Sequence, residues 1–251
     1  MPTLSVYHLI PPAGAANLSF HFGRQGIGLE ETAETLASDS FFAALVVQAA
    51  LNDPRRTADG APVWVEPFLA DQPPLRHSSL LPRIGDLPLL PRPLLPIHLP
   101  PTAELAGKQL KKLRYLSPPL FVAVCKGEVL PADLISLQQG KIWLSEEDAR
   151  RLPAPWKQTA TESSDAWRAR LTATPLWQVE ATPHVTLDRL SAASAYYEVG
   201  RISFAVGAGL SLLVAFADDQ ARPSFEHLLT LLGESGLGGK RTNGYGAFAW
   251  Q

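Results

Sequence analysis

The sequence is poor in cysteine and has no long apolar run, and both shortages exclude classes of protein. Its one cysteine, Cys125, excludes an internal disulfide and a zinc site built from cysteines, which favours a reducing cytoplasm. Cys125 lies in an apolar stretch typical of a strand, so we expect a buried, structural thiol. No basic segment precedes an apolar one at the start, and no uninterrupted apolar stretch reaches the ~20 residues of a membrane span. We therefore expect a cytoplasmic protein with no membrane contact.

An excess of positive charge is also missing. The chain has 22 lysines and arginines against 24 aspartates and glutamates, which gives a formal net charge of −2. Proteins that coat nucleic acid without specificity are usually basic, so any nucleic-acid contact of this chain must be local. One basic cluster comprises Lys108, Lys111, Lys112 and Arg114, and the other is Lys240–Arg241. The first cluster is explained equally well as a solvated face and as an RNA contact.

The motifs of common enzymes and of nucleotide-binding proteins are absent from the sequence. It contains no H-E-x-x-H motif and no carboxylate pair spaced for two metals, and Leu237 replaces the second glycine of a nucleophile elbow at Ser235. A P-loop fails because Glu234 stands at its first glycine position and Arg241 follows Lys240. The dinucleotide pattern fails because Arg241 occupies its third glycine position. We expect no metal and no cofactor.

Glycine is concentrated near the C-terminus, where five glycines surround one basic pair. Glycine lets main-chain N–H groups approach a ligand, and the two cations add charge for phosphate oxygens. The alternative is a flexible connection with two solvated cations. Tyr245 either stacks on a base or packs in the core, and the second is the commoner outcome. The other candidate phosphate contacts are Gly236, Gly238, Gly239, Lys240, Arg241, Thr242, Asn243, Gly244 and Gly246.

Hydrophobic periodicity predicts helices and strands before residue 145. Leu4–Ile10 alternates as a strand, and Ser38 or Asp39 is expected to cap a buried helix over Ser40–Leu51. The segment 73–101 is too rich in proline for a helix and is expected to be extended over the domain. The other expected elements are a strand at 62–69, a helix at 102–113, a strand at 121–126 and a helix at 131–137.

The last third of the sequence has a clearer pattern, whereas 145–177 gives mixed signals and no predicted element. Two strands of this last third, 196–206 and 210–217, are expected to pair through a turn at Gly207–Gly209. Ser224 is expected to cap the last helix. The remaining elements are a strand at 184–189, this helix up to Leu232 with Gly233 as its stop, and a final strand at 245–250.

This order of elements is the second half of a β-α-β-β-α-β motif, and the first strand and helix look like the opening of another. The prediction is an α+β protein with two ferredoxin-like (RRM-like) units that have antiparallel sheets. The first unit spans 1–145 and carries the proline-rich and basic insertion. The second spans 146–251 and ends in the glycine-rich loop.

Four stretches carry a resemblance to a known family. They are His21–Gly23 with Ser38–Phe42; Leu90–Pro96 with Lys111–Tyr115; Pro183–Arg189; and Gly238–Phe248. In this order they resemble the RAMP superfamily of CRISPR systems, whose ferredoxin-like fold has a glycine-rich loop between its last helix and last strand. The chain is most similar to the type III-A (Csm) effector subunit that caps the 5′ end of the guide RNA.

The resemblance implies a non-enzymatic RNA-binding subunit of an antiviral ribonucleoprotein. Its expected partners are the 5′ handle of the guide RNA (crRNA), the large polymerase- or cyclase-like effector subunit, the first backbone subunit of the Csm filament, and target RNA near the guide start. A thumb-like element that enters the guide–target duplex is sought between Arg76 and Tyr115. His21 and the nearby Arg24, which lies among glycines, are further candidate RNA contacts, and Arg189 is a weaker one.

Two other functions fit parts of the sequence. A RAMP endoribonuclease that processes repeat RNA would use His21 as general acid and base, because His21 follows the first strand in a glycine-flanked loop. Within Phe20–Phe22, however, a partly buried histidine that anchors the loop is the stronger interpretation, and no second acid or base is evident. A protein-interaction module would instead present the proline- and leucine-rich segment to a partner.

Overall fold

The computed structural model describes residues 3–23, 28–101, 107–187 and 194–251. The chain forms two compact units. Unit 1 comprises Met1–Leu80, Trp177–Phe204 and Leu210–Gln251, and unit 2 comprises Leu81–Leu176 with Ala205–Gly209. This division differs from the one predicted from the sequence, which placed the boundary between residues 145 and 146. The reason is that the C-terminal strands and helix pack with the N-terminal residues.

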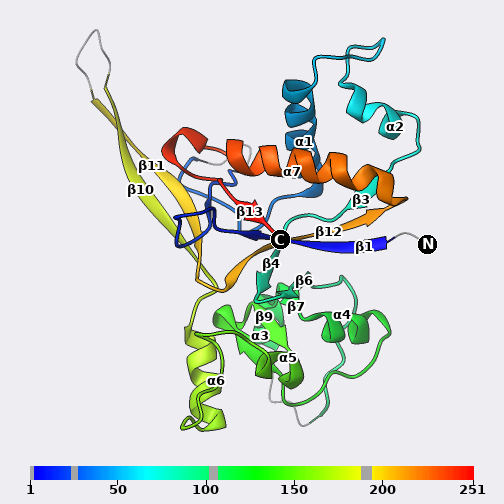
Figure 1. The fold of residues 1–251 in the computed structure, drawn as a ribbon. Coiled ribbons are helices and arrows are strands. Elements are labelled where there is room, and N and C mark those ends of the chain that lie inside the picture. Colours follow the sequence, from blue (N-terminus) through cyan, green and yellow to red (C-terminus); the bar gives the residue numbers. More distant parts are fainter. Residues whose placement is uncertain (1–2, 24–27, 102–106, 188–193) are drawn as a thin grey trace. The chain divides into compact units, whose positions relative to one another are not determined.

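Unit 1 contains two antiparallel sheets and the longest helices (Figure 1). Its elements are β1 (Thr3–Ile10), β2 (Ser19–Phe20), α1 (Ser38–Asn52), η1 (Val63–Val65), α2 (Glu66–Leu69), β3 (Leu75–His77), β10 (Trp177–Leu187), β11 (Ser194–Phe204), β12 (Ala208–Phe216, in this unit from Leu210), η3 (Asp219–Ala221), α7 (Arg222–Ser235), η4 (Arg241–Asn243) and β13 (Ala249–Trp250).

The main sheet of unit 1 joins the two ends of the chain. Its strands lie in the order β13-β1-β12-β3 and each adjacent pair is antiparallel. Helices α1 and α7 lie together on one side of it (Figure 1). Along the chain the elements β1, α1, β3, β12, α7 and β13 have the order β-α-β-β-α-β. The two halves expected as separate units thus form one sheet, and two ferredoxin-like units are not confirmed.

Alternation along β1 decides which face is buried. Tyr7 and Leu9 point to the helix-covered side and are buried, whereas Leu4 and Val6 are exposed. The ring of Tyr7 meets that of Phe225, on α7, edge to face at 5.4 Å. The predicted strand is confirmed, and α7 buries the expected apolar stripe of Phe225, Leu228, Leu229 and Leu232.

Helix α1 is buried on one side only, which corrects the prediction of a buried helix. Phe41, Leu45 and Ala49 recur every fourth residue and form the buried stripe. Val47 is 53% exposed and Leu51 is 75% exposed, so apolar residues also reach the surface. The high apolar content of this helix did not indicate which residues the sheet would cover.

Both long helices begin at or before their predicted caps. α1 begins at Ser38 after Ala37 and α7 begins at Arg222, and neither N-cap residue makes a side-chain hydrogen bond. Gly233 lies inside α7, which ends only before Gly236, where φ is +83°. A Cβ at Gly233 would lie 2.3 Å from the carbonyl oxygen of Phe248. Glycine at this position therefore allows the chain before β13 to approach the helix, and it does not stop the helix.

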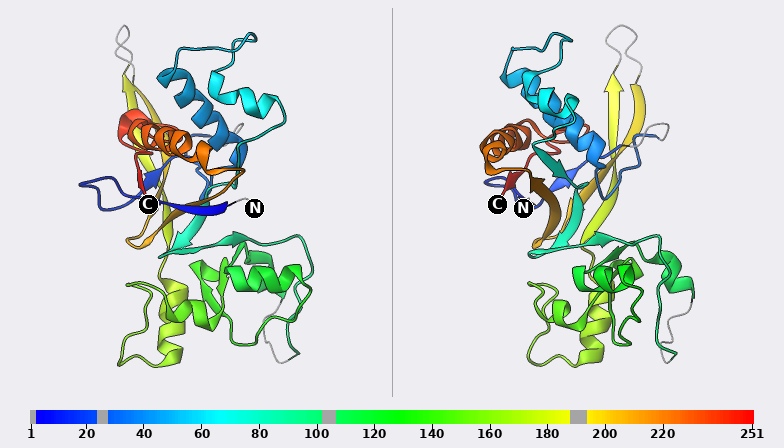
Figure 2. Two further views of the ribbon diagram at one scale, coloured as in Figure 1. Left: turned by 45° about the vertical axis from the view of Figure 1, so that its right-hand side comes forward. Right: turned by 90° about the vertical axis from the view of Figure 1, so that its right-hand side faces the viewer.

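The second sheet of unit 1 has the order β10-β11-β2 and corrects the predicted pairing of the last third. β11 pairs with β10 over the whole length of both 11-residue strands, whereas β12 pairs with β1 and β3. Gly207 therefore lies in a connection between strands of different sheets, Gly209 lies in β12 itself, and the two do not close a hairpin. The β10–β11 hairpin extends beyond the rest of unit 1 (Figures 1 and 2).

Unit 2 is built from short elements around a sheet of order β6-β7-β9-β8. Its core includes Leu116, Leu120, Val124, Leu130 and Trp143. Its elements are β4 (Leu81–Ile84), β5 (Leu87–Pro88), β6 (Leu90–Pro91), α3 (Gly107–Lys112), β7 (Tyr115–Leu116), α4 (Pro118–Cys125), β8 (Ile135–Leu137), η2 (Gln138–Gly140), β9 (Ile142–Leu144), α5 (Glu146–Arg150) and α6 (Ser164–Ala173).

Three short apolar segments adopt the opposite structure from the predicted one. The expected strand at 121–126 is helix α4, which prolines at its first turn favour, and Cys125 is exposed rather than buried. The expected helix at 131–137 contains strand β8. The expected strand at 62–69 is η1 followed by α2. Short apolar runs fit a strand and one side of a short helix equally well.

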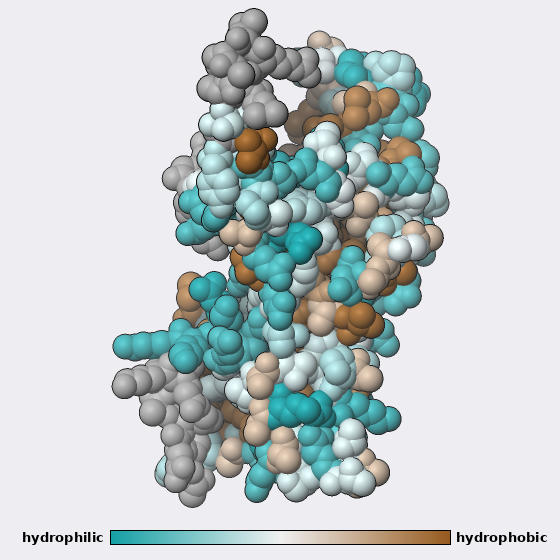
Figure 3. Space-filling view, turned by 90° about the vertical axis from the view of Figure 1, so that its left-hand side faces the viewer, coloured by the Kyte–Doolittle hydropathy of each residue, from teal (hydrophilic) through white to brown (hydrophobic). Residues whose placement is uncertain are grey.

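The proline-rich segment contains strands β3 to β6 and no helix, as its composition predicts. The helix predicted at 102–113 is present as α3 within the described residues. Among the described helices none is long and apolar enough to cross a membrane. On the face that Figure 3 displays, the described apolar residues form separate small patches between polar ones.

Candidate nucleic-acid interface

The glycine-rich loop of residues 236–246 is anchored at both ends to unit 1. The N–H of Leu237 donates to the carbonyl of Gly246, and the N–H of Gly246 donates to that of Ser19, at 2.9 and 2.8 Å. The N–H of Gly239 donates to the carbonyl of His21 at 2.9 Å. The loop is therefore held against the segment that follows β2.

Several glycines of the loop are required by packing against the chain itself. A Cβ at Gly246 would lie 2.2 Å from the carbonyl oxygen of Leu237, and a Cβ at Gly238 would lie 2.6 Å from that of His21. Real Cβ atoms do not approach backbone atoms so closely, so both positions need glycine. The sequence suggested close approach to a ligand, whereas at these positions the close neighbour is the protein's own backbone.

The other part of the loop is open and offers unused donors. The N–H groups of Lys240, Arg241 and Thr242 donate to no residue that the structure describes. Lys240 has left-handed backbone angles, with φ +57° and ψ +30°, directly before the single turn η4. Successive N–H groups at such a change of hand form a concavity that binds anions. The Arg241 side chain is exposed and makes no ion pair with a described residue.

An aromatic side chain lies beside the basic pair. The ammonium of Lys240 lies 5.0 Å from the ring centre of Tyr197 on β11, a cation–π distance. The Tyr197 ring also stacks on that of His184, its partner across the hairpin, at 5.5 Å. Sequence reasoning missed Tyr197 and His184, because their approach to Lys240 depends on the β10–β11 pairing that was predicted wrongly.

His21 is an anchor between the loop and the hairpin. Its side chain is 4% exposed, and Nδ1 lies 2.7 Å from the carbonyl oxygen of Gly200 on β11. A carbonyl only accepts hydrogen bonds, so Nδ1 carries the proton and donates. This arrangement favours the anchoring interpretation over contact with RNA. Tyr245 is 9% exposed, so its ring packs inside the protein and offers no face for base stacking.

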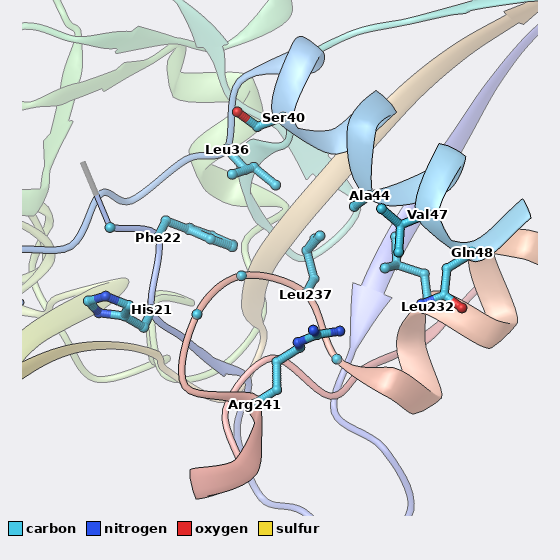
Figure 4. Close-up of a pocket in the computed structure, with 14 residues that line it drawn as sticks. His21, Phe22, Leu36, Ser40, Ala44, Val47, Gln48, Leu232, Leu237 and Arg241 are labelled. Atoms are coloured by element: carbon cyan, nitrogen blue, oxygen red, sulfur yellow. The ribbon is translucent and has the colours of Figure 1, made fainter. Parts of the chain in front are cut away.

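A cavity of about 370 Å³ opens beside the loop (Figure 4). Figure 4 shows Phe22, Leu36 and Leu237 pointing into one hollow from separate segments, while Arg241 reaches toward it from the loop. One face of α1 and the end of α7 complete the lining, with Ser40, Ala44, Val47, Gln48 and Leu232. Sequence reasoning identified the loop but not this cavity, because α1 contributes it from far along the chain.

The remaining predicted contacts are not brought to the loop. Lys111, Lys112 and Arg114 belong to unit 2, where their side chains are exposed at and after the end of α3. The side chain of Lys108 lies outside the described residues, as do Arg24 and Arg189. Thr242 and Asn243 lie in the open turn, where their side-chain oxygens are 3.3 Å apart. No group of three His, Cys, Asp or Glu side chains that could hold a metal occurs in the described ranges.

Comparison with known proteins finds solved structures only; no protein-family model and no curated protein matches the chain. The crystal structure of the Csm3–Csm4 subcomplex in the type III-A CRISPR–Cas interference complex contains a similar chain, with TM-score 0.62 and 18% identity over 100% of this chain and 68% of that one. The Csm1–Csm4 cassette with cA4 contains another, with TM-score 0.54 and 16% identity over 100% and 70%. A third, from the cassette with pppApA, has TM-score 0.52 and 15% identity over 100% and 69%.

At these identities the comparison establishes a common fold. The similarity extends over the whole of this chain in all three cases, although each of the solved chains is longer. Csm4 is the component that the two kinds of complex share. The chain therefore has the fold of a chain found in both kinds of complex.

Proposed function

We propose that this chain is a non-catalytic guide-RNA-binding subunit of a type III-A CRISPR effector, in which it caps the repeat-derived 5′ handle. It docks the large polymerase-like subunit and adjoins the first backbone subunit of the filament. The similar structures are complexes that pair Csm4 with Csm1 and with Csm3, which supports these two protein partners.

The observation that carries the proposal is the open turn of the glycine-rich loop. The unused N–H groups of Lys240, Arg241 and Thr242 follow one another, and two cations stand on the same turn. Single-stranded RNA is bound by such main-chain donors and cations on phosphates, together with aromatic faces for its bases. A near-neutral chain with one such turn is suited to hold one short piece of RNA.

The β10–β11 hairpin is a better candidate for the thumb than the segment 76–115. It is the long projecting hairpin of unit 1 (Figure 2), and its strands are 11 residues each. On one of its faces Val185 and Tyr196 lie opposite each other and are 60% and 65% exposed. Apolar side chains on a projecting element can wedge between stacked bases. We assign target-RNA contact near the guide start to this hairpin.

The burial and hydrogen bonding of His21 support the absence of catalysis. Its ring is buried and its Nδ1 proton is held by the carbonyl of Gly200, so it is placed as an anchor and not as an exposed acid and base. Incubation with repeat RNA tests this directly. Site-specific cleavage that His21→Ala abolishes would establish the endoribonuclease instead.

The decisive experiment measures binding of a labelled guide RNA, with and without the large subunit, at several salt concentrations. Lys240→Ala combined with Arg241→Ala is expected to weaken binding at least about tenfold. Loss of two phosphate contacts should also lower the slope of log affinity against log salt by about 1.4. Arg150→Ala with Arg151→Ala is the matched control, because it removes the same charge from exposed positions of unit 2 that are not candidate RNA contacts. Equal losses in both double variants would show a general charge effect and contradict the loop assignment.

A further inference from the structure

The cavity beside the glycine-rich loop combines an apolar wall with one buried amide. Leu36, Ala44, Val47 and Leu232 contribute to the wall, and Phe22 closes one side (Figure 4). Gln48 is 5% exposed and is among the few polar side chains that line it. An apolar pocket with a few placed polar groups is typical of small-molecule and base-binding sites.

The hydrogen bonds of Ser235 determine which way the Gln48 amide is turned. Ser235 Oγ donates to the carbonyl of Leu231 at 2.9 Å, so its proton is already used. Gln48 lies 2.5 Å from the same Oγ and must donate to it through Nε2. Its Oε1 then accepts no hydrogen bond from any residue in the described ranges. The amide therefore keeps an unused acceptor and one further N–H in the lining of the cavity.

We infer that one base of the guide-RNA handle enters this cavity and that Gln48 reads its edge, an inference that rests on the proposed function. A base with a donor beside an acceptor, as adenine has, pairs with a glutamine amide through two hydrogen bonds. Other base edges also place a donor beside an acceptor, but the N6–H and N7 of adenine are the common bidentate partner of a glutamine amide, so we assign the occupant as adenine, bound on its edge by Gln48 and on its faces by apolar side chains.

The position of Arg241 connects this cavity to the phosphate site. Arg241 lines the cavity and belongs to the same open turn whose N–H groups are free. One nucleotide can therefore place its phosphate on the turn and its base in the hollow. A cavity of about 370 Å³ is near the lower end of the ~300–1,000 Å³ range of ligand pockets, which suits one base rather than several.

The test uses guide RNAs that carry a single abasic site at each handle position in turn. With the wild-type chain, one position is expected to bind about tenfold more weakly when its base is removed. Restoring that position with each of the four bases should show adenine bound most tightly. Binding that is equal for every abasic RNA would overturn the inference.

Two variants connect that position to the cavity. Ala44→Leu fills the cavity while Gln48 stays in place, and Gln48→Leu replaces the amide by an apolar group of similar size. With either variant, the RNA lacking that base and the intact RNA should bind equally well. Ala43→Leu is the matched control, since Ala43 is exposed on the same helix and does not line the cavity. Retention of base discrimination by Ala44→Leu would contradict the inference.

The outcomes distinguish this inference from the proposed function. If RNA binding is lost with Lys240→Ala and Arg241→Ala but no base matters, the proposed function stands and the base pocket fails. If no variant affects RNA binding, the proposed function itself fails. If Ala44→Leu instead abolishes association with the large subunit and leaves RNA binding unchanged, a protein side chain occupies the cavity, and the inference is overturned.

Discussion

The glycine-rich loop has two parts that look alike in sequence and differ in structure. The packed part, Gly236–Gly239 with Gly246, lies against its own backbone, and its N–H groups at Leu237, Gly239 and Gly246 are used internally. The open part, Lys240–Gly244, keeps its first N–H groups and both cations unused by hydrogen bonds. A glycine-rich sequence therefore does not predict one kind of structure. Some of its glycines are required by close packing against the backbone, whereas Gly244 has open space around it.

The largest effect is expected from Gly246→Ala in the packed part. The new Cβ would lie 2.2 Å from the carbonyl oxygen of Leu237, at a residue whose φ is +88°. Overpacking and left-handed strain together should lower the free energy of unfolding by roughly 2 to 4 kcal/mol. Urea unfolding measures it. A loss below about 1 kcal/mol would mean that the packed part can move, and the contrast between the two parts would weaken.

His21→Phe tests the anchor of the packed part. Phenylalanine keeps an apolar ring but removes the Nδ1–H that donates to Gly200, which leaves a buried carbonyl without this partner. The expected loss is about 1 to 3 kcal/mol of unfolding free energy. His21→Asn, whose amide N–H₂ can approach the same carbonyl, is the comparison variant and should recover part of the loss. Unchanged stability in His21→Phe would show that the histidine does not anchor the hairpin.

Gly244→Ala is the matched change in the open part. Its φ of +83° is similar to that of Gly246, but a Cβ there meets nothing within 4 Å. Only the left-handed strain remains, so the loss should be about 1 to 2 kcal/mol. The difference in unfolding free energy between the two alanine variants measures the cost of overpacking at Gly246. Equal losses would contradict the distinction between the parts.

Lys240→Gly separates stability from binding within the open part. Glycine removes the strain of φ +57° but also increases the freedom of the unfolded chain, so stability should change by less than about 1 kcal/mol. RNA affinity should still fall, because the cation beside Tyr197 is lost. Thermal unfolding and RNA titration on the same preparation measure both. A parallel loss of stability and affinity would indicate a structural role for Lys240.

Alkaline pH is expected to weaken the main sheet through Tyr7, which lies on β1 and not in the loop. Burial, with a hydrogen bond to Glu226, raises the pKa of Tyr7 from 10.0 to about 12. The folded state therefore holds this proton more tightly than the unfolded state. Its stabilising effect is complete below pH 10, pH 7 included, and is lost as pH rises toward 12, so around pH 7 this tyrosine gives stability no pH dependence. Tyr7→Phe should remove this part of the decline; a decline of the same steepness in the variant would assign it to other groups.

Long periodic segments were predictable, and short apolar ones were not. The apolar residues of β1 alternate along the strand, and those of α7 recur on one side of the helix over several turns. Both elements lie near their predicted bounds. The helix 118–125 and the strand 135–137 span too few residues for a period to show. Their conformation follows the sheet and core of unit 2. The candidate loop was found from composition. The cavity depends on α1, and the contact of Tyr197 with Lys240 depends on the position of β11, so neither could be found in this way.

By itself, the sequence determined the α+β character, the local basic turn and the long amphipathic elements, because these depend on neighbouring residues. The tertiary structure alone decided that β1 and β3 share one sheet with β12 and β13, with α1 and α7 together on one side of it, and that β11 pairs with β10 rather than β12. It also decided which glycines of the loop are packed. Strand pairing and close backbone approach are set by residues far apart in the chain, and no local pattern records their partners.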